Sequence, residues 1–139
     1  MKNTLIALAL LPFGSLWAME IQPVPSAEQL PVARITEHGK AYLVDPLGFS
    51  LYRFDKDSQG KSTCYAECAQ NWPPLLASAT EVKAGLGKAA DAGFALLQRQ
   101  DGQYQWSYRG HPLYRWVKDS APGQSSGDGV KNVWHRVQL

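Results

Sequence analysis

Two cysteines give this chain its clearest chemical feature, because Cys64 and Cys68 are the only cysteines in the sequence. In an exported protein such a pair favours a disulfide, and a spacing of four can be bridged when the Cα atoms lie within about 7 Å. Two thiolates also suit Cu(I), with a distant histidine to complete the site. The candidate histidines are His111 and His135. The alternative to a disulfide is therefore a periplasmic copper-binding or thiol-redox protein.

Tryptophans supply a second kind of candidate surface. Trp72, Trp106, Trp116 and Trp134 could line a groove for a glycan or a hydrophobic ligand. They could equally form the core of a small β domain. We find no His-Glu-x-x-His pair and no other catalytic constellation. We therefore expect a protein that is not an enzyme, and an aromatic ligand platform remains an alternative function.

One stretch of the chain occurs twice, and the same offset relates every repeated position. These positions are Tyr52, Phe54, Asp57 and Trp72 in the first copy, and Tyr114, Trp116, Asp119 and Trp134 in the second. In a strand, Tyr52 and Phe54 share one face. Because duplicated positions usually encode shared architecture, we predict that the aromatics pack the core and that the aspartates close turns.

The cysteine pair is confined to the first copy. Ser126 and Val130 stand at the corresponding positions of the second copy. A feature that the duplication did not preserve is more specific than a shared one, so the functional hypothesis falls on the loop that carries Cys64 and Cys68.

The repeated motif resembles that of a bacterial family of predicted secreted proteins and lipoproteins, which is defined by a repeated Tyr-x-(Phe/Trp/Tyr)-x-x-Asp pattern. The Tyr52–Asp57 and Tyr114–Asp119 stretches both match this pattern, and the resemblance extends over about residues 38–137. It implies export and a duplicated unit. It implies no established activity, and so it assigns no catalytic residue.

The elements that must position these residues are strands. Short runs rich in β-forming residues, separated by turn signals, predict an all-β, mainly antiparallel fold. Residues 32–76 and 94–139 form two homologous units, each expected to be a meander of three to four strands, and the Ala- and Gly-rich residues 77–93 link them. One such unit cannot bury its apolar face alone. We therefore expect a single β domain, 32–139, in which the units pack as a pseudo-symmetric sandwich or flattened barrel.

The start of the chain is typical of a signal peptide. Lys2 precedes the apolar run Leu5–Leu11, so we expect residues 1–18 to be removed and the protein to be periplasmic or secreted. Residues 19–31 contain three prolines and are expected to form an extended N-terminal arm.

Charge and hydropathy limit the partners. The chain has 14 basic and 12 acidic residues and a formal net charge of +2, which argues against nucleic acid and against electrostatic membrane docking. No later run approaches the roughly 20 apolar residues of a membrane span. No cysteine lies near the expected cleavage site, so we expect no lipid anchor. These observations predict an exported, non-catalytic binding or structural protein of the cell envelope that needs no cofactor and has an unknown partner.

Overall fold

The computed structural model describes residues 19–139, so the predicted signal peptide lies outside the described residues. In chain order the elements are β1 (Ala33–Glu37), β2 (Lys40–Val44), β3 (Tyr52–Phe54), α2 (Glu67–Asn71), β4 (Leu76–Ala77), α3 (Ala79–Ala84), the 3-10 helix η1 (Gly87–Ala90), β5 (Phe94–Gln98), β6 (Tyr104–Tyr108), β7 (His111–Pro112), the 3-10 helix η2 (Val130–Asn132) and β8 (Trp134–Arg136). Among residues 19–139 strands dominate and every helix is short, which confirms the predicted fold class.

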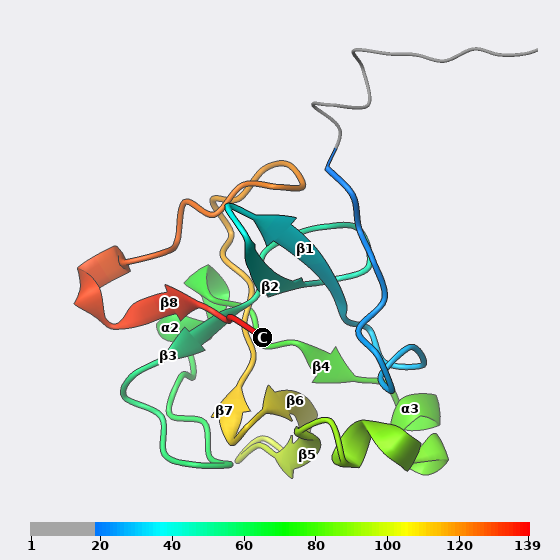
Figure 1. The fold of residues 1–139 in the computed structure, drawn as a ribbon. Coiled ribbons are helices and arrows are strands. Elements are labelled where there is room, and N and C mark those ends of the chain that lie inside the picture. Colours follow the sequence, from blue (N-terminus) through cyan, green and yellow to red (C-terminus); the bar gives the residue numbers. More distant parts are fainter. Residues whose placement is uncertain (1–18) are drawn as a thin grey trace, which may run out of the picture.

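The strands of the described residues form three small antiparallel sheets. β1 pairs with β2, β3 pairs with β8, and β4, β5 and β7 all pair with β6. Figure 1 shows the β1–β2 and β5–β6 hairpins at opposite ends of the domain, with β3 and β8 between them. Within residues 19–139 no sheet closes into a barrel, so the flattened barrel that we considered is not formed.

Each unit forms a three-strand antiparallel meander, as the sequence predicted. In the first unit β1 pairs with β2 and Val44 of β2 bridges to Ser50, and in the second β5, β6 and β7 pair in succession. The two units also exchange backbone partners at the repeated motif. The Tyr52 amide donates to the Tyr114 carbonyl at 2.8 Å, and the Tyr114 amide donates to the Tyr52 carbonyl at 3.0 Å. These reciprocal bonds mark a pseudo-twofold axis between the copies. From this point β3 of the first unit continues along β8 of the second.

The last segment of each unit also crosses to the other unit. The Leu75 amide donates to the Leu113 carbonyl at 2.9 Å, and the Val137 amide donates to the Leu51 carbonyl at 3.1 Å. After Leu75 the chain continues as β4 beside β6. Neither unit therefore completes its hydrogen bonding alone, in keeping with the rule that small sheets need a partner.

The N-terminal arm is packed on the domain. Val24, Ala27 and Leu30 are buried in the main hydrophobic cluster, and Gln22 and Arg34 exchange backbone hydrogen bonds at 2.9 and 2.8 Å. In Figure 1 this blue segment runs along β1 toward the end of the domain that holds β4 and α3. Residues 19–31 are thus part of the fold and not a free lead-in.

The linker contains α3, a helix with a full capping box. The Ser78 side chain accepts a hydrogen bond from the Glu81 amide, and the Glu81 side chain accepts one from the Ser78 amide. These bonds satisfy amides that a helix start leaves open, and they begin α3 at Ala79. In residues 19–139 there is no helix with the length and apolar character to cross a membrane.

Candidate functional site

The repeated motif joins the two copies through its side chains. The Tyr52 hydroxyl donates to Asp119 Oδ2 at 2.5 Å, and the Tyr114 hydroxyl donates to Asp57 Oδ2 at 2.8 Å. The tyrosine of each copy is therefore held by the aspartate of the other. Burial raises the pKa of both tyrosines, so the hydroxyls keep their protons and act as donors.

The second oxygen of each aspartate closes the loop that follows it. Asp57 Oδ1 accepts from the Thr63 amide at 2.8 Å, and Asp119 Oδ1 accepts from the Ser126 amide at 2.9 Å. The sequence predicted only this local closure. Burial raises the pKa of the Asp57 carboxyl, although the hydrogen bonds from Thr63 and Tyr114 act in the opposite direction.

Four aromatic rings stack across the pseudo-twofold axis. Trp72 and Trp134 are parallel, with ring centroids 3.9 Å apart and an interplanar angle of 1°. Trp116 stacks on Trp72 at 3.9 Å, and Phe54 stacks on Trp134 at 4.1 Å. Two rings cannot share one face at these distances, so the order is Phe54, Trp134, Trp72, Trp116. We call this set the ring stack.

A groove follows the ring stack. It encloses about 400 Å³ and is lined by Phe54, Lys56, Glu67, Cys68, Asn71, Trp72, Trp116, Val130, Lys131, Val133 and Trp134. The repeat offset pairs Phe54 with Trp116, Cys68 with Val130, and Asn71 with Val133. We call this the seam groove, because each repeat supplies one of its walls.

Charged residues make the two walls different. Lys56 follows β3, Glu67 begins α2, and Lys131 lies in η2.

The backbone of η2 is unusual. Lys131 has φ 50° and Asn132 has φ 61°, two successive left-handed conformations at residues other than glycine. Such conformations cost of order 1 kcal/mol each and concentrate at functional sites.

A second hollow of about 310 Å³ lies beside Trp116, and its lining includes Leu47, Phe49, Arg115 and Val117. Arg115 Nε lies 3.1 Å from the buried carboxylate of Asp45, so its charge is already compensated. Both hollows are lined by both repeats. We prefer the seam groove as the candidate site, because it holds two lysines without carboxylate partners in the described part of the chain.

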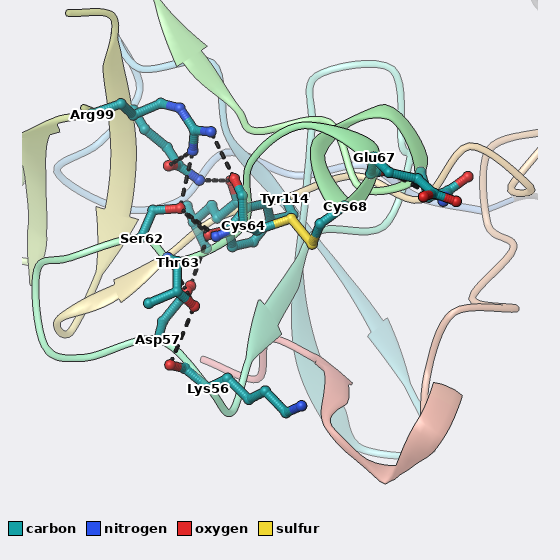
Figure 2. Close-up of a disulfide and its surroundings, with 12 residues drawn as sticks. Lys56, Asp57, Ser62, Thr63, Cys64, Glu67, Cys68, Arg99 and Tyr114 are labelled. Atoms are coloured by element: carbon teal, nitrogen blue, oxygen red, sulfur yellow. Dashed lines mark hydrogen bonds between the residues drawn. A yellow bond between two sulfur atoms is a disulfide. The ribbon is translucent and has the colours of Figure 1, made fainter. Parts of the chain in front are cut away.

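The two cysteines form a disulfide. Cys64 is fully buried, Cys68 reaches the seam groove, and their Cα atoms are 5.3 Å apart. In Figure 2 this bond ties the loop after Thr63 to α2. A disulfide leaves no thiolate to bind a metal ion, so copper binding would require its reduction.

A buried arginine fixes the cysteine loop. Arg99 donates to the Cys64 carbonyl at 2.7 Å and to Ser62 Oγ at 3.0 Å. Ser62 Oγ lies 2.6 Å from the Tyr114 hydroxyl, which itself donates to Asp57. Figure 2 shows this chain of polar groups from Arg99 to Asp57 beside the disulfide. The loop of the first copy is thus joined to the shared motif through Tyr114.

The candidate histidines lie in separate environments. His111 is exposed on β7, whereas His135 Nε2 lies 2.7 Å from Asp55 Oδ2. Among residues 19–139 no three His, Cys, Asp or Glu side chains are grouped so that they could hold a metal ion. The metal set of Cys64, Cys68 and the two histidines is therefore not assembled in this structure.

The sequence predicted aromatic residues that line the seam groove but missed several of its polar lining residues. Trp72, Trp116 and Trp134 line the groove, whereas Trp106 is fully buried in the main cluster. Glu67, Asn71 and Lys131 were missed. The signal that could have found their positions is the repeat offset, which relates the two walls to each other.

The fold and the groove define a class, a duplicated β domain whose copies line one groove together. The chain belongs to the family described as a secreted repeat of unknown function, whose repeat matches residues 33–76 and again residues 95–138. These boundaries agree with the two units seen in the sequence. No curated protein and no solved structure gives a significant match to the chain.

Proposed function

We propose that this is an exported, non-catalytic binding protein of the cell envelope, periplasmic or secreted, and that it takes its ligand in the seam groove. The observation that carries the proposal is the groove itself, since a concave, mainly apolar site with a few polar groups is the usual form of a ligand site. Its volume of about 400 Å³ is in the range of small-molecule pockets.

The engagement of the repeated motif supports a non-catalytic role. Its tyrosines and aspartates bind each other across the repeats, so none is left as a free acid, base or nucleophile. Residues Gly123–Gly127 match the pattern Gly-x-Ser-x-Gly, which in hydrolases carries a nucleophilic serine on a strand-to-helix turn, the nucleophile elbow. Here the stretch lies in a run of turns and coil, and Ser125 contacts no histidine by hydrogen bond within residues 19–139.

The tryptophan indole N–H signals provide a direct test by NMR. A panel of soluble peptidoglycan fragments, oligosaccharides and peptides is titrated into the protein. We expect a saturable shift of the Trp72, Trp116 and Trp134 signals, because these residues line the groove. Trp106 is the internal control, since it is buried in a different cluster. The ligand should be recovered with unchanged mass.

A variant separates binding in the groove from binding elsewhere. A Cβ at Gly127 would lie 2.8 Å from Trp72 Cη2 and 3.0 Å from Trp116 Cγ, so Gly127→Ala must displace the ring stack. We expect this change to weaken binding while the protein stays folded. Ligand binding that shifts Trp106 as strongly, or that is unaffected by Gly127→Ala, would contradict the proposal.

A further inference from the structure

We propose that the seam groove is selective for small organic anions, meaning molecules that carry a carboxylate beside an apolar ring. This inference rests on the proposed function, that the groove binds a ligand, and it names the chemical class of that ligand. Three features of the residues that line the groove support it, namely the ring edges, the indole N–H groups and the two lysines.

The two inner rings of the ring stack have both faces covered, so only their edges can contact a ligand. Trp72 is covered on one side by Trp134 and on the other by Trp116, and Trp134 is covered by Trp72 and Phe54. Lys118 Nζ lies 5.7 Å from the centroid of Trp116, over its ring. The face of an aromatic ring is negative and attracts cations, whereas its edge is positive. A groove that follows ring edges therefore favours a negative group.

The indole N–H groups add hydrogen-bond donors. Those of Trp72, Trp116 and Trp134 form no hydrogen bond within residues 19–139, and none is among the fully buried atoms that lack a partner. Each therefore reaches solvent, although Trp72 is only 4% and Trp134 only 3% exposed. Indole N–H is a donor only, so its partner must be an acceptor.

Two lysines complete the positive character of the groove. Neither Lys56 nor Lys131 forms an ion pair in the described part of the chain, and Glu67 is the one acidic residue in the lining. Lys131 lines the groove and has a left-handed backbone conformation. A carboxylate between the two ammonium groups gains charge-assisted hydrogen bonds, which are about twice as strong as neutral ones.

The lining also limits the rest of the ligand. Val130, Val133 and the rings form an apolar surface, and the volume of about 400 Å³ fits a molecule of one or two rings. The ring of the ligand could be a sugar or an aromatic ring, since both combine an apolar surface with a carboxylate. Matched probes distinguish these two sources.

The experiment uses two pairs of probes that differ in charge. Phenylacetate is compared with phenylacetamide, and glucuronate with glucose, by calorimetry and by the shifts of the indole N–H signals. We expect at least one anion to bind about 10-fold more tightly than its neutral partner, because charge-assisted hydrogen bonds are the stronger class. The pair that responds identifies the source as aromatic or sugar. The preference should decrease with added salt, which screens exposed charges.

Variants assign the preference to the groove. Lys56→Met and Lys131→Met should each weaken binding of the anion by about 5-fold and leave the neutral probe unaffected. Lys88→Met is the matched control, because Lys88 is an exposed lysine of η1 and does not line the groove.

Three results would overturn the inference. They are equal binding of the anion and its neutral partner, anion binding that both lysine variants leave unchanged, and no binding of either anion at about 10 mM, a concentration that would nearly saturate a site with a Kd of about 1 mM. A neutral probe that shifts the groove indoles and binds as tightly as its anion would overturn the anion preference alone, and the proposed function would stand. A ligand that binds without moving these signals would contradict both.

Discussion

At the scale of single residues, the repeated tyrosines and aspartates act between the copies and not within one copy. Asp119 is buried and accepts hydrogen bonds from Tyr52 and from Ser126, so it binds its own loop and the other repeat at once. The motif therefore has a structural role, because its side chains join the two repeats. A strand-local pattern of six residues carries an interaction that spans half of the chain.

Removing one of these hydroxyls tests that role. Tyr52→Phe leaves Asp119 with one fewer donor in a buried site, so we expect the free energy of unfolding to fall by about 1–3 kcal/mol. Denaturant unfolding measures the change. Tyr104→Phe is the matched control, because the Tyr104 hydroxyl forms no hydrogen bond within residues 19–139. Equal stability of the two variants would contradict the structural role of the bond.

Two aspartates should titrate on opposite sides of the ordinary value of about 3.9. Burial raises the pKa of Asp57, whereas the hydrogen bond from His135 lowers the pKa of Asp55. Folded Asp57 holds its proton more tightly than the unfolded chain does, so its effect on stability becomes less favourable as pH rises from about 3.9 through the folded pKa. The contribution of Asp55 is present above about 3.9 and is lost as pH falls through its lower folded pKa.

Carboxyl NMR titration measures both groups in one sample. We expect Asp57 to titrate at a higher pH than Asp55. His135→Ala should raise the pKa of Asp55 and leave that of Asp57 unchanged, because His135 contacts only the former. A lower pKa for Asp57 than for Asp55 would show that its hydrogen bonds outweigh its burial.

At the scale of elements, the disulfide and Arg99 hold the loop of the first copy, and the corresponding loop of the second copy has no cysteine. The bond connects the loop before α2 to α2, a helix of only one turn without a side-chain cap. Isolated helices of this length are not stable. The disulfide and the contacts of Cys68 with the aromatic cluster therefore keep α2 at the seam groove.

The double variant Cys64→Ser and Cys68→Ser tests whether the disulfide stabilises α2 and its loop. The closed loop is short, and the chain-entropy relation gives about 2 kcal/mol of stabilisation for it. We expect the melting temperature to fall accordingly, with wild-type protein in reductant as the matched comparison. Alkylation of the native protein without reductant is the second measurement. Uptake of the reagent would mean free thiols and would favour the copper or thiol-redox alternative.

At the scale of the whole molecule, the two repeats are one folding unit. β3 pairs with β8, β4 pairs with β6, and the ring stack takes rings from both copies. These contacts bring together residues far apart in the sequence, as in folds that depend on non-local pairing. A site between the copies exists only when both are folded.

Separate halves of the chain test this dependence. We expect residues 19–93 and residues 94–139 to be unfolded when produced alone, because β3 and β8 then lack partners. Amide dispersion in NMR spectra reports the folded state, and the full domain is the control. Cooperative unfolding of either half alone would contradict the exchange of strands as the basis of the fold.

Much of the fold could be predicted from the sequence. Alternation of residues along a strand puts Tyr52 and Phe54 on one face, and the offset that relates Tyr52 to Tyr114 revealed the duplication. The pairing of the first three strands within each unit was among the features predicted correctly. Periodicity fixes the face that a strand buries, but not the strand that it meets, so it did not show that the last strand of each unit pairs with the other unit.

The sequence by itself determined the duplication, the antiparallel β class and a cysteine pair close enough to bridge, because these depend on neighbouring residues and on local spacing. Only the tertiary structure decided that the copies exchange their last strands, that Trp72 stacks on Trp134 while Trp106 does not, and that Lys56 and Lys131 border one groove. These outcomes depend on how two apolar faces cover each other, and that is settled by packing between residues far apart in the chain.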